Sequence, residues 1–146
     1  MRIFLLVLAV AVFSCQELPK KYRGEEGKKL LEKYRYQFVE GVVEIDPSLK
    51  DQIPEEKHFL IIAVKDKENP MPIAVLRVSD PEFPYKFKIT GKDKLREDRF
   101  IEGELILTAR VSRSQGAEAQ KGDLVGSAEA RAGQRGVLIK ITDKVN

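Results

Sequence analysis

The sequence predicts an all-β domain, a sandwich of about seven short strands, behind an export signal and a short helix. Short apolar stretches, either β-branched or strictly alternating, recur from residue 38 onward. Segments rich in turn-forming residues separate these stretches, and six of the seven prolines lie in such segments, outside the strand interiors. The length of 146 residues and the hydrophobic fraction of 42% suit one domain with its own core.

Residues 1–14 have the pattern of a secretory signal peptide. Arg2 supplies the positive charge, and Ile3–Phe13 is an unbroken apolar run, which is too short for a membrane-spanning helix of roughly 20 residues. The run leads into Val12-Phe13-Ser14-Cys15, which resembles the lipobox of bacterial lipoproteins. We therefore expect lipidation of Cys15 and a lipid-anchored protein on the periplasmic side of a bacterial membrane. The alternative is a plain signal peptide with a free cysteine nearby.

Residues 15–37 are expected to form a tether and a short helix. Gln16–Glu26 is polar and contains Pro19 and Gly24, a composition typical of a linker. Glu25–Gln37 carries apolar residues at spacings of three and four, which predicts a helix of roughly 8 to 12 residues.

The folded domain is expected over residues 38–146. Phe59–Val64 is apolar on both faces, which predicts a central strand, and Tyr85–Ile89 alternates apolar residues with lysines. Seven short strands separated by turns fit an immunoglobulin-like β-sandwich, and another small β-barrel or β-sandwich is the alternative. The seven expected strands are Val39–Ile45, Phe59–Val64, Ile73–Val78, Tyr85–Ile89, Glu104–Ser112, Gly122–Ala130 and Val137–Ile141.

The composition excludes several kinds of chemistry. One cysteine and one histidine provide neither an internal disulfide nor a structural zinc site. Charged residues make up 34% of the chain, with a formal net charge of +3 and interleaved signs, which argues against a nucleic-acid binder with one dense basic face. The remaining expectation is a binding or assembly module, with no catalytic residues, no cofactor and no metal.

His58 and Met71 are the residues that come nearest to a chemical site. Together they could ligate haem iron, but Met71 stands between two prolines and is more simply a hydrophobic plug at a corner. His58 borders an apolar strand, where a surface or strand-edge role is expected rather than a catalytic one.

Three motifs in a fixed order resemble one known family. Their residues are Gly41–Leu49 followed by Phe59–Ala63; Asn69–Arg77 followed by Phe83–Tyr85; and Leu107–Ser114 with Ala117 and Gly122–Gly126. In this order and spacing they resemble the C-terminal periplasmic domain of the CycH/CcmI component of cytochrome c maturation. The resemblance extends over roughly residues 38 to 145.

The resemblance implies an Ig-like sandwich outside the cytoplasmic membrane and partners in the haem-ligation machinery, apocytochrome c, or both. Full-length family members also carry two transmembrane helices and a tetratricopeptide repeat region, which this sequence lacks. The repeat region is credited with gripping the apocytochrome, so that activity is not carried over. Lys65 and Gln115 also depart from the family pattern.

The motif residues allow a structural interpretation and a functional one. Structurally, Pro70 and Pro72 suit a rigid corner, while Gly122 with Asp123 suits a turn and Gly126 a bulge. Arg110 alternates away from the apolar face of its strand and is expected either to pair with Asp123 or to dock a partner. The candidate partner surface is Met71, Arg77, Arg110 and Arg113, because arginine and exposed methionine are enriched in interfaces.

The function expected from these observations is a membrane-anchored accessory module of c-type cytochrome biogenesis that acts by protein–protein contact. The alternative is a general bacterial envelope lipoprotein whose β-sandwich binds another protein or ligand. An enzyme is the least favoured reading.

Overall fold

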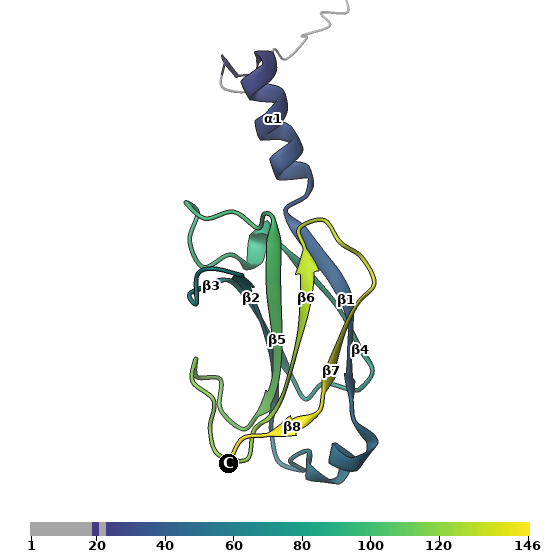
Figure 1. Ribbon diagram of the computed structural model, residues 1–146. Helices are drawn as coiled ribbons and strands as arrows, with labels where there is room; N and C mark the ends of the chain where they lie inside the picture. Colours follow the sequence, from purple (N-terminus) through teal and green to yellow (C-terminus); the bar gives the residue numbers. More distant parts are fainter. Residues whose placement is uncertain (1–18, 21–22) are drawn as a thin grey trace, which may run out of the picture. The chain divides into compact units, whose positions relative to one another are not determined.

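The computed structural model describes residues 19–20 and 23–146 (Figure 1). The expected signal peptide, Cys15 and residues 16–18 and 21–22 of the tether lie outside the described residues. The chain divides into two compact units, residues 1–31 and residues 32–146. Helix α1 (Gly24–Arg35) agrees with the predicted helix; its first turn carries Glu25 and Glu26 and its last turn Lys33 and Arg35, an order that complements the helix dipole.

The second unit contains an immunoglobulin-like β-sandwich of two sheets (Figure 1). One sheet has three strands in the order β4-β1-β7, and the other has five in the order β3-β2-β5-β6-β8. The strands are β1 (Phe38–Ile45), β2 (Phe59–Asp66), β3 (Pro72–Ser79), β4 (Tyr85–Thr90), β5 (Glu104–Ser112), β6 (Leu124–Arg131), β7 (Val137–Ile141) and β8 (Asp143–Lys144).

Three short elements were not predicted from the sequence. Two are 3-10 helices, η2 (Pro47–Gln52) and η3 (Gly91–Asp93), and the third is β8. The segment Asp46-Pro47-Ser48 was expected only as a turn, but the Asp46 carboxylate accepts a hydrogen bond from the Ser48 amide at 2.9 Å and caps η2. All three elements are shorter than the periodicity of a helix or strand needs to become visible in sequence.

The core lies between the sheets and follows from alternation along each strand. Leu105, Leu107, Ala109 and Val111 of β5 point into it, as predicted, and Leu60, Ile62 and Val64 of β2 meet them. β1 and β7 run parallel, with Val43 opposite Ile139. The central apolar residues are therefore withdrawn from water, which supplies the main stabilisation of the fold.

The last strands join the two sheets. β7 pairs with β1 in the three-stranded sheet, and two residues later β8 pairs with β6 in the five-stranded sheet. At this crossing the Thr142 amide donates to the Val125 carbonyl at 3.1 Å. Gly126 makes the close approach possible, because a Cβ atom there would lie 2.1 Å from the Lys140 carbonyl oxygen.

The role of Gly126 corrects the expectation of a bulge. β5 and β6 pair without a register shift, and Gly126 stands opposite Ala109. A glycine is needed here because the backbone of β7 lies directly against this position, and not because β6 itself is irregular.

Candidate functional site

The outer face of the five-stranded sheet carries a transverse row that combines apolar and cationic side chains. In this row Arg77 of β3 stands opposite Ile61 of β2, and Ile61 stands opposite Arg110 of β5. The neighbours of Ile61 along β2, Leu60 and Ile62, point into the core, so Ile61 faces outward. It is nevertheless only 6% exposed.

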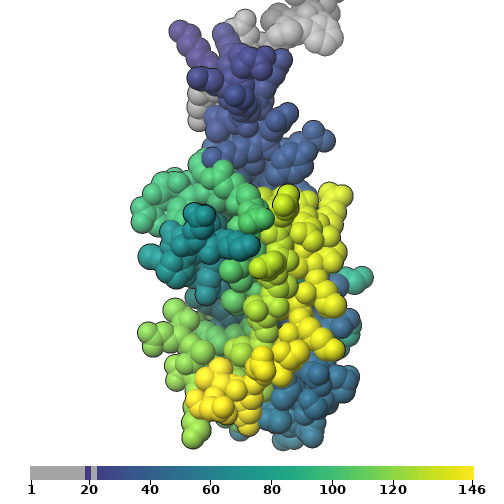
Figure 2. Space-filling view, in the orientation of Figure 1, coloured from purple at the N-terminus to yellow at the C-terminus, as the bar shows by residue number. Residues whose placement is uncertain are grey.

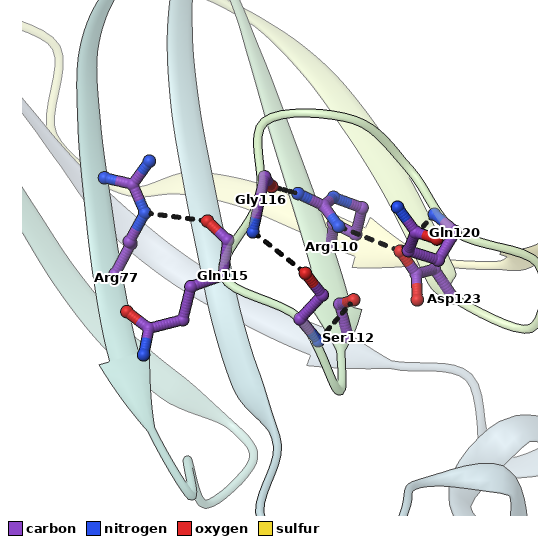
Figure 3. Close-up of polar contacts among 8 residues, drawn as sticks. Arg77, Arg110, Ser112, Gln115, Gly116, Gln120 and Asp123 are labelled. Atoms are coloured by element: carbon purple, nitrogen blue, oxygen red, sulfur yellow. Dashed lines mark hydrogen bonds and ion pairs between the residues drawn. The ribbon is translucent and has the colours of Figure 1, made fainter.

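The loop between β5 and β6 covers this row. We call residues 113–121 the strap. The Arg77 Nε donates to the Gln115 carbonyl at 3.3 Å, and the Arg110 Nη2 donates to the Gly116 carbonyl. The strap therefore runs from one arginine to the other (Figure 3). Because these two arginines flank Ile61 in the sheet, the strap accounts for the low exposure of Ile61.

A buried ion pair fixes the far end of the strap. The Arg110 Nη1 lies 2.9 Å from the Asp123 Oδ2, and the Gln120 amide donates to the same carboxylate oxygen at 2.8 Å (Figure 3). Gly122 precedes Asp123 with φ +92°, a conformation that suits glycine. A buried charge is tolerated only when it is paired and hydrogen-bonded, and both conditions hold here.

Two serines shape the near end of the strap. The Ser112 hydroxyl accepts from the Ser114 amide, and the Ser114 hydroxyl accepts from the Gly116 amide, both at 3.1 Å (Figure 3). These local bonds turn the chain back over the sheet immediately after β5. The third sequence motif thus supplies these serines and the Arg110–Asp123 pair, whereas Arg77, which also holds the strap, belongs to the second motif.

A groove of about 670 Å³ lies between the strap and the C-terminal crossing. Small residues of β5 and β6 line it, so an occupant of the groove can come close to the backbone of these strands. Its polar lining residues include Lys65, Thr108 and Asp143. The lining residues are Lys65, Thr108, Ala109, Arg110, Ala117, Ala119, Val125, Gly126, Ser127, Lys140, Thr142 and Asp143.

The size and lining of the groove are those of a ligand-binding site. Pockets of about 300 to 1,000 Å³ with a few placed polar groups are typical of ligand sites. The residues that the structure describes contain no cluster of three or more His, Cys, Asp or Glu side chains able to hold a metal ion. What the groove offers is polar side chains beside a shallow apolar floor.

Three of the four residues of the predicted partner surface, Arg77, Arg110 and Arg113, come together at the strap, and Met71 does not. Arg77 is exposed and holds the strap, and Arg113 is exposed and pairs with Glu56 at 2.9 Å. Arg110 is a correction: only 8% of it is exposed, because Asp123 and the strap enclose it. Of the two roles expected for Arg110, the structure places it in the pairing with Asp123.

Met71 lies apart from the groove, at the turn between β2 and β3. It is 62% exposed. Arg99 Nη1 donates to the Met71 carbonyl at 2.7 Å and to the Pro72 carbonyl at 3.2 Å. With Pro70 and Pro72 on either side, these bonds fix a corner from which the methionine side chain projects into solvent.

His58 and Met71 stand at opposite ends of β2, about 25 Å apart for a strand of this length. The structure does not bring them together as haem ligands. His58 Nδ1 lies 2.9 Å from the Glu56 carbonyl oxygen and 3.5 Å from Asp80 Oδ1. The imidazole therefore contacts the loop before β2 and the residue that follows β3, and it helps to fix the start of β2.

Sequence reasoning missed the strap because backbone groups make its decisive contacts. The carbonyls of Gln115 and Gly116 and the amide of Gln120 bind the arginines and Asp123, and any residue type can supply such groups. One signal was present: Phe59–Val64 is apolar on both faces, and an outward apolar face requires a cover.

Comparisons with known proteins agree with this architecture. The Ig-like domain of cytochrome c-type biogenesis protein H matches residues 39–142, which include both sheets as far as the end of β7 and the whole strap. An uncharacterized protein of Aquifex aeolicus (strain VF5) is 52% identical over 141 residues, which is 97% of this chain and 94% of the relative. No solved structure matches.

Proposed function

The chain belongs to the family of the Ig-like domain of cytochrome c-type biogenesis protein H, which supports a role in c-type cytochrome maturation, and we propose that it acts there as a non-catalytic accessory module through protein–protein contact. The observation that carries the proposal is the site formed by the third motif. Leu107–Ser114, Ala117 and Gly122–Gly126 carry the family resemblance. They include Arg110 and Asp123, which hold the strap, and six of the twelve residues that line the groove.

The contact surface in this proposal is the groove and the strap beside it. Its partner is a component of the haem-ligation machinery or the apocytochrome itself. The polar groups of Lys65, Thr108 and Asp143 are suited to orient a polypeptide, and the alanines of the strap leave room for it.

Anchoring completes the proposal. Lipidation of Cys15 would hold the module on the periplasmic side of a bacterial membrane, where haem is attached to c-type cytochromes. No helix among the described residues is long and apolar enough to cross a membrane. Acyl chains contribute about 0.8 kcal/mol per buried CH₂, and two or more chains anchor a protein stably.

A deletion strain tests the proposal. We expect its covalently bound haem and its c-type cytochromes to fall, and the wild-type gene to restore both. Ala119→Arg, which fills the groove wall, should fail to restore them, whereas Glu118→Arg, on the neighbouring exposed strap residue outside the groove lining, should succeed. Unchanged cytochrome levels in the deletion strain would refute the proposal and favour a general envelope lipoprotein.

A further inference from the structure

One stretch of β6 has a free edge. The Thr142 amide bonds to the Val125 carbonyl, so the backbone groups of Val125 point away from β5. Backbone groups alternate sides along a strand, so those of Ser127, Glu129 and Arg131 point the same way. The Arg131 amide confirms this, because it donates to the Gln134 side chain at 2.9 Å rather than to β5.

The groups between these two bonds have no partner. β8 pairs with β6 only at Leu124 and Val125. Within residues 19–20 and 23–146, nothing bonds to the outward N–H and C=O groups of Ser127 and Glu129. Together they form a ready template for another strand.

β7 approaches β6 closely at Gly126, and beyond that point cavities flank the edge. Ser127 lines the groove of about 670 Å³, and Glu129 lines a smaller cavity of about 300 Å³ with Arg131 and Gln134. The Ser127 and Glu129 side chains are both exposed, on the outer face of the sheet. Figure 2 shows the yellow-green atoms of β6 at the surface, beside the yellow atoms of the C-terminal residues.

We propose that the Ser127–Glu129 edge of β6 is a strand-addition site for an extended polypeptide segment that carries a basic side chain opposite Glu129. The added strand continues the line of β8 beyond the point where the chain leaves it at Thr142. Backbone hydrogen bonds supply the affinity, and the flanking cavities receive side chains of the segment.

Charge complementarity selects the basic side chain. Across the ladder Glu129 stands opposite the apolar Ile106, and on the outer face of the strand it presents an exposed carboxylate. Glu104, in contrast, is already flanked by Lys67 at 3.5 Å and Arg131 at 3.7 Å. Opposite charges in directly facing strand positions attract, and like charges repel.

This inference rests on the proposed function, because it assumes the same protein partner. It adds that the bound segment of the partner is extended and still unfolded. Its test, however, uses only the full chain and synthetic peptides. The probe is a ten-residue peptide of alternating threonine and valine in which one central threonine is replaced by lysine. Amide chemical shifts of the full chain report the contact even when binding is weak.

Two backbone-methylated peptides form the matched pair. The residue opposite Glu129 directs its own N–H and C=O toward β6, so methylating the amides of lysine and every second residue from it blocks pairing. Methylating the alternate set leaves that edge intact. We expect the first peptide to bind at least tenfold more weakly than the second, and the Ser127 and Glu129 amides to shift with the second alone.

Protein variants separate the backbone from the side chain. Ser127→Pro removes an N–H that β5 does not use and should weaken peptide binding at least tenfold, whereas Ser127→Ala should leave it unchanged. Glu129→Lys should weaken binding of the lysine peptide, and a peptide with glutamate in place of that lysine should restore it. The peptides keep the test decisive even if Ser127→Pro fails to fold.

Equal binding of the two methylated peptides, or no amide shifts at Ser127 and Glu129 with millimolar peptide, would overturn the strand-addition site. If the deletion strain still lost cytochrome c, the proposed function would stand without it. If peptides paired with β6 but the deletion strain kept its cytochrome c, the strand-addition site would stand and the proposed function would fall.

Discussion

Arg110 and Asp123 form a buried ion pair between the five-stranded sheet and the strap, with the arginine Nη1 2.9 Å from the aspartate Oδ2. Their side chains are 10% and 6% exposed. The pair ties the C-terminal part of β5 to the residue just before β6, and the same arginine donates to the Gly116 carbonyl of the strap. One side chain thus connects the strap to the sheet at two points.

Removing one member of this pair should be severe. Asp123→Ala leaves the Arg110 guanidinium buried without a counter-charge, and such losses typically cost about 3 to 5 kcal/mol of unfolding free energy. Denaturant unfolding measures the change. Arg113→Ala is the matched control, because its pair with Glu56 is exposed on both sides and should contribute about 1 kcal/mol or less. Equal losses in the two variants would contradict the role of burial.

Gly126→Ala should destabilise the fold by more than about 3 kcal/mol or prevent folding, since overpacking a close contact forces the backbone to move. The new Cβ would lie 2.1 Å from the Lys140 carbonyl oxygen. Gly91→Ala is the control, because nothing lies within 4 Å of a Cβ there and its φ is not positive. Thermal unfolding of both variants provides the comparison, and a wild-type melting temperature for Gly126→Ala would disprove the close approach.

Gln37→Met should lower the unfolding free energy by about 2 kcal/mol, because it leaves buried backbone groups unsatisfied. The Gln37 side chain donates to the Ile101 carbonyl at 2.7 Å and accepts from the Ile101 amide at 2.9 Å, and Ile101 is fully buried. Gln52→Met, at an exposed position, should be near neutral. Chemical denaturation distinguishes them, and a neutral Gln37→Met would show that the two bonds contribute little.

Asp46 should make stability depend on pH in the acid range. Hydrogen bonds from the Ser48 amide and hydroxyl hold the pKa of Asp46 below its ordinary value of 3.8. A lowered folded-state pKa stabilises the fold above pH 3.8, and the effect is lost as pH falls through the folded value. The stability difference between wild type and Asp46→Asn should therefore be constant near neutrality and shrink below about pH 4.

Unfolding titrations from pH 3 to pH 7 measure this dependence. Asp51→Asn, an exposed aspartate of the same η2 segment, is the control. A wild-type advantage that grew on acidification would have the wrong sign for a lowered pKa and would exclude this explanation.

Cys15→Ser should abolish incorporation of a fatty-acid analogue and move the protein from the membrane fraction to the soluble periplasmic fraction. The expectation follows from the lipobox-like sequence that ends at the only cysteine of the chain. Ser14→Ala keeps a small residue before the cysteine and is the control. Label retained by Cys15→Ser would refute lipid attachment at this position.

Much of the fold was predictable from the sequence because strand alternation is a local property. Tyr85–Ile89 and Glu104–Ser112 each show their inward residues in the printed order, and both became strands at those positions. The short elements η2, η3 and β8 escaped prediction, since each depends on a single cap or on a neighbour distant in sequence.

The sequence by itself determined the seven longer strands, their inward faces and the family, because side-chain period and motif order are local properties of the chain. Only the tertiary structure determined that Arg110 is buried. Strand alternation places its side chain on the outer face of the sheet, and the strap then covers it there. The tertiary structure also showed that Gly126 must be a glycine because the backbone of β7 lies against it, and that the outward backbone groups of Ser127 and Glu129 are unpaired. The physical reason is that contacts between backbones depend on which strands become neighbours in space, and backbone groups are the same for every residue type.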